Sequence, residues 1–125
     1  MGYRSDAALA LTEHGRNIFN QKLVSSDTTD AVRHDVSRLL AHASQHKCDA
    51  ETKSECWLWH GVKWFTGDPA CYRDIRFIES VLDTLDETDY YFVRIGEDTD
   101  DNEIRGLWLD NPFEIILCRE IVLDS

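Results

Sequence analysis

The sequence predicts an α+β fold, a single-domain two-layer sandwich with helices on one face of a mainly antiparallel sheet. Three observations predict it. Apolar residues recur at helical spacing in residues 29–44 and 69–86, residues 3–12 alternate with the period of a strand, and several short strand-like segments follow one another near the C-terminus. With 125 residues, of which 42% are hydrophobic, the chain fits one domain covering residues 1–125.

Residues 3–12 are predicted to form the first strand. Its two faces carry different residues: Tyr3, Ser5, Ala7, Leu9 and Leu11 on one, and Ala8 and Ala10 on the other. Because the side chains on the second face are small, another element can pack closely against it. A short helix is expected over residues 16–24, and the turn formers of SSDTTD end it and cap the next helix.

The second helix is predicted over residues 29–44, because its apolar residues form a single stripe on a helix surface. They are Val32, Val36, Leu39, Leu40 and Ala43. The segment that follows, QHKCDAETKSE at residues 45–55, is polar and has no period. We therefore expect it to be an exposed loop.

A strand with a bend is predicted in CWLWHGVKWFT at residues 56–66. A bulge or bend at His60-Gly61 reconciles two series of apolar residues that differ in phase. They are Trp57 and Trp59 before it, and Val62 and Trp64 after it. The tryptophans, Trp108 included, are expected mostly in the core, and an exposed one beside acidic residues would be an anchor for a protein partner.

The third helix is predicted over residues 69–86, with Asp68 as its N-cap and Pro69 at its first position. Its apolar residues again recur at helical spacing: Ile75, Ile78, Leu82 and Leu85. Three strands are then predicted, and the turn DNP separates the last two. They are YYFVRI at 90–95, EIRGLWL at 103–109 and FEIILCREIVL at 113–123.

The composition restricts the classes of partner. The chain has 24 acidic and 13 basic residues, and its formal net charge of −11 repels nucleic-acid backbones and membrane surfaces but attracts basic protein surfaces. We therefore expect no direct nucleic-acid binding. No apolar run approaches the ~20 residues of a membrane span, and the N-terminal sequence lacks a signal-like core, so a cytoplasmic location with four free cysteines is expected.

The motifs of the common enzyme classes are absent. The sequence contains no G-x-x-x-x-G-K, G-x-G-x-x-G, H-E-x-x-H, G-x-S-x-G or C-x-x-C. A calcium loop starting at Asp98 fails, because Glu103 stands where glycine is needed and Leu109 stands where the last glutamate is needed. We therefore expect a protein that is not an enzyme and has no cofactor.

An alternative is a zinc-binding protein or enzyme, because imidazole and thiolate are ligands that zinc prefers. The candidates lie around the predicted loop: His42, His46, Cys48, Cys56 and His60. His42 and His46 are four residues apart, which places them on one helix face. Since the two cysteines lack the spacing of a zinc knuckle, solvated histidines and a buried Cys56 are the simpler interpretation.

Acidic residues concentrate between positions 83 and 103. Nine of them occur there with a single basic residue, Arg94, for a net charge of −8: Asp83, Asp86, Glu87, Asp89, Glu97, Asp98, Asp100, Asp101 and Glu103. If the strand at 90–95 runs back across the sheet, the helix end and the loop after the strand form one negative face. Such a face resembles a phosphate array to a nucleic-acid-binding protein, or it only keeps the protein solvated.

Short motifs spread over most of the chain resemble one group of proteins. The start MGYRSD, the central VKWF, and FVRIGED followed by REI resemble small, mostly uncharacterised bacteriophage and prophage proteins that open M-G-Y-R-S and carry V-K-W and R-I-G-E in this order. Residues 45–55, with Cys48 inside the segment and Cys56 directly after it, depart from that pattern. The resemblance implies a mobile-element protein acting inside a bacterial cell, with no catalytic residues to carry over.

The acidic cluster and the resemblance together favour an acidic interaction protein. We expect it to bind a host protein with a basic surface, and in the sharpest form to inhibit a nucleic-acid-targeting defence system, as an anti-CRISPR protein or nucleic-acid mimic would. The chain could also form a homodimer. The predicted contact residues are the nine acidic ones.

Overall fold

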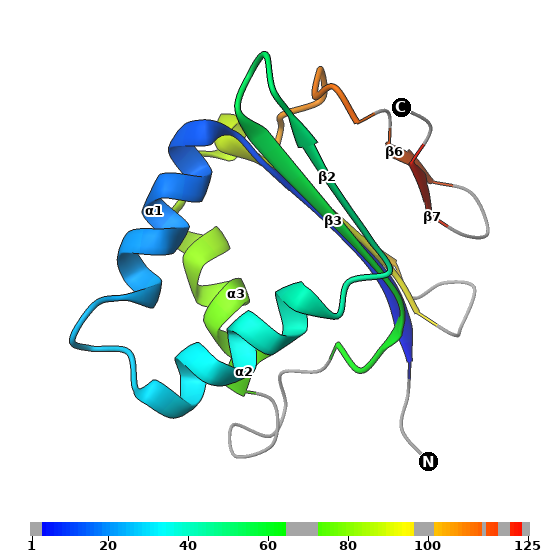
Figure 1. Ribbon diagram of the computed structural model, residues 1–125. Coiled ribbons are helices and arrows are strands. Elements are labelled where there is room, and N and C mark those ends of the chain that lie inside the picture. Colours follow the sequence, from blue (N-terminus) through cyan, green and yellow to red (C-terminus); the bar gives the residue numbers. More distant parts are fainter. Residues whose placement is uncertain (1–3, 65–72, 97–101, 114, 118–120, 124–125) are drawn as a thin grey trace.

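The computed structural model describes residues 4–64, 73–96, 102–113, 115–117 and 121–123, and its main feature is a five-stranded sheet (Figure 1). The strand order is β2-β3-β1-β4-β5, and every neighbouring pair is antiparallel. The strands are β1 (Ser5–Leu11), β2 (Gln45–Asp49), β3 (Ser54–Val62), β4 (Tyr90–Ile95) and β5 (Asn102–Arg105). The predicted α+β class is confirmed.

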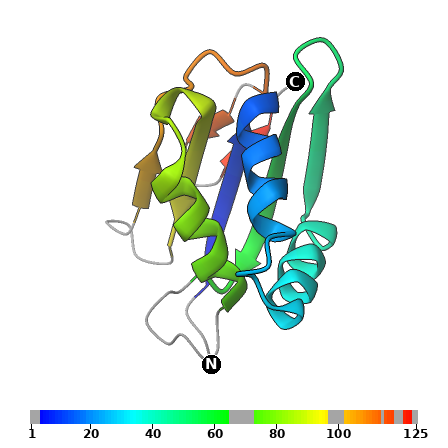
Figure 2. The same cartoon turned by 90° about the vertical axis from the view of Figure 1, so that its left-hand side faces the viewer.

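Three helices cover one face of this sheet: α1 (Glu13–Leu23), α2 (Asp30–Ala41) and α3 (Arg73–Thr84) (Figures 1 and 2). A short antiparallel hairpin, β6 (Ile115–Leu117) and β7 (Ile121–Leu123), lies on the other side (Figure 1). The predicted arrangement of helices on one face is therefore confirmed. Among the described residues, no helix is long and apolar enough to cross a membrane.

The central strand β1 divides the core into two parts, as its alternation predicts. Ala7, Leu9 and Leu11 belong to the cluster under the helices, where they join buried residues such as Phe19 and Ile78. The small face formed by Ala8 and Ala10 packs in a second cluster with Cys56, Leu58, Val93 and Phe113. The small residues thus allow the segment carrying Phe113 to approach the sheet closely.

Threonine caps define the starts of the first two helices. The Thr12 side chain accepts a hydrogen bond from the Gly15 N–H at 3.0 Å, so α1 begins at Glu13, three residues earlier than predicted. Thr29 caps α2 in the same way, and α2 ends at Ala41, earlier than the predicted end at residue 44. The predicted cap of the third helix, Asp68 with Pro69, lies outside the described residues.

The predicted bend at His60-Gly61 is confirmed. Gly61 has φ +66°, and the register between β1 and β3 shifts between the pairs Ser5–Val62 and Ala7–Trp59. The shift changes the phase of the following residues. Trp57, Trp59 and Trp64 consequently all reach the core under the helices.

The prediction that residues 45–55 form an exposed loop is wrong. Gln45–Asp49 is an edge strand that pairs with the first half of β3, from Gln45 opposite Leu58 to Asp49 opposite Ser54. Its side chains are exposed or half-buried. An edge strand with little burial needs no alternation of apolar and polar residues. The polar sequence of residues 45–49 therefore gave no indication of a strand.

Two predicted strands near the C-terminus also differ from the structure. The strand expected at 103–109 ends at Arg105, because Gly106 has φ +88° and turns the chain away. The segment 113–123 is not one strand, since its two halves pair with each other, with Ile116 opposite Val122. That apolar run contains no glycine or proline to mark a reversal.

The two glycines with positive φ provide a test of this backbone. A Cβ at Gly106 would lie 2.2 Å from the Tyr90 carbonyl oxygen, whereas a Cβ at Gly61 would meet nothing closer than 3.9 Å. Gly61→Ala should therefore lower the free energy of unfolding by about 1–2 kcal/mol, from backbone strain alone. Gly106→Ala adds a collision with backbone and should cost about 2–4 kcal/mol. Urea denaturation measures both, and equal losses would contradict the close approach at Gly106.

Candidate functional site

An open groove of about 610 Å³ lies between the C-terminal end of α3 and β5. Leu82, Leu85 and Tyr90 line it and are buried. Ile104 and Leu107 also line it, but they are 52% and 58% exposed. Exposed apolar side chains that border a groove make this surface a candidate binding site.

Backbone hydrogen bonds fix the segment that follows β5. The Leu107 N–H donates to the Glu87 carbonyl at 2.6 Å, and the Trp108 N–H donates to the Tyr90 carbonyl at 3.2 Å. The acceptors belong to the short 3-10 helix η1 (Glu87–Asp89) and to the first residue of β4. The turn at Gly106 therefore holds Leu107 against the start of η1, beside the groove.

An ionic cluster joins β5 to α3. The Arg105 guanidinium donates to the Glu79 carboxylate and, at 2.6 Å, to that of Asp83. Glu79 also accepts a hydrogen bond from the Trp64 indole at 3.3 Å. Burial raises the pKa of Glu79 above its ordinary value, although Trp64 and Arg105 oppose that rise. Arg105 is therefore the cation that offsets part of the cost of burying this carboxylate.

The two faces of β5 differ in chemistry. Arg105 faces α3, and Glu103, two residues earlier on the same face, accepts a hydrogen bond from Arg94 at 3.4 Å. Ile104 lies opposite Val93 and so faces the other side of the sheet. Within the described residues, β5 pairs only with β4, and Figure 2 shows it at one edge of the sheet. The site is an edge strand with a charged face and a second face that exposes Ile104.

Five of the nine predicted acidic contact residues are described, and most have partners within the chain. Asp89 accepts from the Thr12 hydroxyl at 2.9 Å, and Asp86 caps η1 by accepting from Thr88. Those Thr88 hydrogen bonds lower the pKa of Asp86. Besides these, Asp83 and Glu103 bond to arginine, and Glu87 is exposed beside the groove. Glu97, Asp98, Asp100 and Asp101 lie outside the described residues.

The structure does not bring all five predicted zinc ligands together. The His42 ring bonds to the Arg38 carbonyl at the end of α2, and the His60 ring lies 3.5 Å from the Asp6 carboxylate. Cys56 is buried in the cluster on the other face of the sheet, and burial raises its pKa to about 12. Only His46 and Cys48 are neighbours, with their Nε2 and Sγ atoms 3.7 Å apart. Their third neighbour is Glu55, which the sequence did not indicate.

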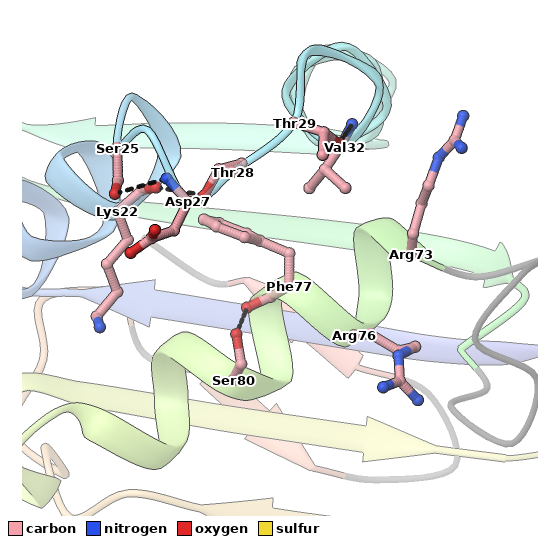
Figure 3. A pocket seen from close by; sticks show the side chains of 10 residues that line it. All are labelled: Lys22, Ser25, Asp27, Thr28, Thr29, Val32, Arg73, Arg76, Phe77 and Ser80. Carbon is pink, nitrogen blue, oxygen red and sulfur yellow. Dashed lines mark hydrogen bonds between the residues drawn. The ribbon is translucent and has the colours of Figure 1, made fainter.

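A second pocket, of about 470 Å³, lies between the α1–α2 turn and α3. Figure 3 shows Phe77 near Thr28 and Val32, whereas the side chain of Arg73 extends away from them. Arg73 is also paired with Asp35 on α2. The basic groups around this pocket do not converge on one point, so the groove at β5 is the stronger candidate site.

Comparisons with protein-family models, with curated proteins and with solved structures found no match to this chain.

The Arg105 cluster gives a prediction with a pH signature. Arg105→Gln should lower the free energy of unfolding by about 1–3 kcal/mol at pH 7, because it leaves the Glu79 carboxylate partly buried without its cation. Loss of the cation raises the folded-state pKa of Glu79 further above its unfolded value. Protonation of Glu79 then favours the folded state, so the deficit should shrink as the pH falls from 7 to 5.

Urea denaturation at the two pH values measures this effect. The double variant Arg105→Gln/Glu79→Gln should show a smaller pH dependence than the single variant, since the titrating group is absent. The control is Arg76→Gln, at an exposed position of α3, the helix that carries Glu79. It should change the free energy of unfolding little at either pH. A deficit of the same size at both pH values would contradict the assigned role of Arg105.

Proposed function

We propose that this chain is a protein-binding module that uses the edge strand β5 and the adjoining groove to bind a basic, amphipathic segment of another protein. One observation carries the proposal: the exposed Ile104 and Leu107 lie at the same sheet edge as the exposed acidic residues Asp83 and Glu87, around one open groove. Apolar anchors supply affinity, and the surrounding acidic groups select a basic partner.

The edge of β5 favours an extended partner. A strand that added to β5 would satisfy its outer backbone groups and place alternate side chains on opposite faces of the sheet. On the α3 side such side chains would meet Asp83, which is 69% exposed, and Glu103. On the other side they would meet Ile104. A segment with alternating basic and apolar residues has the complementary chemistry.

The anchors differ from those that the sequence suggested. Three of the tryptophans are buried in the core, and Trp108 packs edge-on against Phe113 with ring centroids 6.4 Å apart. Aliphatic side chains therefore take the role of the anchor in this proposal. Individual exposed ion pairs contribute only ~0–1 kcal/mol, so the carboxylates act mainly on partner choice and association rate.

The phage-protein resemblance narrows the proposed partner to a host protein in the bacterial cytoplasm. A nucleic-acid-targeting complex has a basic groove for its nucleic acid, and an acidic protein of net charge −11 could occupy it. Inhibition of such a defence system, in the manner of an anti-CRISPR protein, is thus the specific form of the proposal. It requires no catalysis and no cofactor.

Interference assays and binding assays with a purified CRISPR effector complex test the proposal. Ile104→Asp should weaken binding at least ~10-fold although it makes the protein more acidic, because it removes an apolar anchor. Asp83→Lys/Glu87→Lys should also weaken binding, whereas the control Asp27→Lys/Glu51→Lys makes the same charge change at exposed turn positions away from β5. Circular dichroism confirms that each variant is folded.

Salt gives an independent measurement of the same interaction. Raising it from ~0.1 M to ~1 M shortens the Debye length from about 10 Å to about 3 Å, so complex formation should slow markedly. If Asp83→Lys/Glu87→Lys and the control Asp27→Lys/Glu51→Lys lost equal affinity, binding would depend on the net charge of the protein and not on the surface at β5. A concentration-dependent dimer that Ile104→Asp abolishes would assign the edge to a second copy of this chain, and would overturn the proposal of a different partner.

A further inference from the structure

Three different potential metal ligands converge at the opposite edge of the sheet, on β2 and β3. They are His46 and Cys48, both on β2, and Glu55 on β3. A ring nitrogen of His46, the Cys48 sulfur and a Glu55 carboxylate oxygen all lie within 4.8 Å of one another. Cys48 and His46 are exposed, and Glu55 is half-buried, so the group is open to solvent on one side.

The strand register explains why these three side chains meet. Cys48 lies directly opposite Glu55 in the antiparallel pair, and His46 is two residues before Cys48 on the same face. Cys56, by contrast, lies opposite Lys47 and faces the other way. A regular strand pair therefore sets the spacing of the three groups.

Neighbouring side chains hold two of the three in place. The His46 ring stacks on Trp57 with centroids 5.2 Å apart and an interplanar angle of 8°, and Trp57 is only 2% exposed. Arg16 on α1 donates to Oε1 of Glu55 at 2.9 Å, and its guanidinium lies 4.9 Å from the Trp57 ring centroid. Oε2 of Glu55 is thus directed at His46 Nε2, at 2.8 Å. Such outer contacts are typical of ligating histidines and carboxylates.

One of the distances between the ligand atoms is close to that of a tetrahedral site, and the others require small shifts. Zinc binds sulfur at ~2.3 Å and nitrogen or oxygen at ~2.0–2.2 Å, so ligand atoms around it are roughly 3.3–3.6 Å apart. The His46 Nε2 to Cys48 Sγ distance is 3.7 Å. The 2.8 Å contact between His46 and Glu55 is a hydrogen bond. If a zinc ion replaced the proton shared by His46 Nε2 and Glu55 Oε2, these two atoms would have to separate by roughly 0.5 Å. The exposed imidazole of His46 can make this shift.

We propose that His46, Cys48 and Glu55 bind one Zn²⁺ ion and leave its fourth position open to solvent. Thiolate, imidazole and carboxylate together favour zinc over the harder magnesium and calcium ions. The ion cross-links the edge strand β2 to β3. The site lies at the opposite edge of the sheet from β5 and does not depend on the protein-binding function.

Metal titration of the chelator-treated full-length protein tests the site. Zn²⁺ followed by calorimetry should bind with one-to-one stoichiometry, and Co²⁺ should produce the near-ultraviolet absorption of a sulfur-to-cobalt charge transfer. Removal of outer contacts at metal sites costs ~10–100-fold in affinity, so loss of a direct ligand should cost at least ~100-fold. We expect this loss for Cys48→Ser, His46→Gln and Glu55→Gln, and Cys48→Ser should also abolish the charge-transfer band.

Matched control variants separate this site from binding elsewhere in the chain. Cys56→Ala, His42→Gln and Glu51→Gln change the same residue types outside the cluster and should keep the wild-type affinity. Zn²⁺ should raise the melting temperature of the wild type and of the controls, but not that of Cys48→Ser. Binding that persists in all three ligand variants, or a cobalt complex without a thiolate band, would overturn the proposed site.

Discussion

The burial of β1 is the constraint on which the rest of the structure depends. Residues 7 to 11 have no exposed surface, and the strand pairs with β3 on one side and β4 on the other. Leucines on one of its faces require a thick covering, which three helices supply, whereas alanines on the other permit only the close approach of Phe113 and its neighbours. The two layers that cover the sheet thus reflect the alternation of large and small residues along β1.

The same constraint directs function to the edges of the sheet. Most side chains on the three central strands are used for packing, so accessible polar and reactive groups lie mainly on β2 and β5 and at adjoining positions such as Glu55. At one edge lie His46, Cys48 and Glu55, and at the other lie Ile104 and its acidic neighbours. The strands β1 and β4 separate the two groups, so we expect substitutions at one edge to have effects that are independent of those at the other.

The sequence was sufficient where structure follows from local periodicity. The alternation in β1, the stripe on α2 and the change of phase at Gly61 depend only on residues close together in the chain, and each was predicted. The edge strand β2 was missed because it has no buried face to impose a pattern. Glu55 was missed for a related reason. It lies next to His46 and Cys48 because β2 and β3 pair in a defined register, and a segment predicted to be a loop has no register from which such neighbours can be inferred.

Local sequence also overstates how much negative charge β5 and its surroundings present to a partner. Between positions 83 and 103 the chain contains nine acidic residues and only Arg94. Folding brings Arg105 to Asp83 and to Glu79 on α3, and it directs Asp89 to Thr12, 77 residues away. The Arg105 ion pairs offset part of the negative charge and join α3 to β5, whereas the Thr12 hydrogen bond fixes Asp89 beside the start of α1. The exposed side chains of Ile104 and Leu107 therefore characterise this surface more than its charge does. Removing exposed apolar side chains from water is favourable, so these two residues would contribute most of the binding free energy.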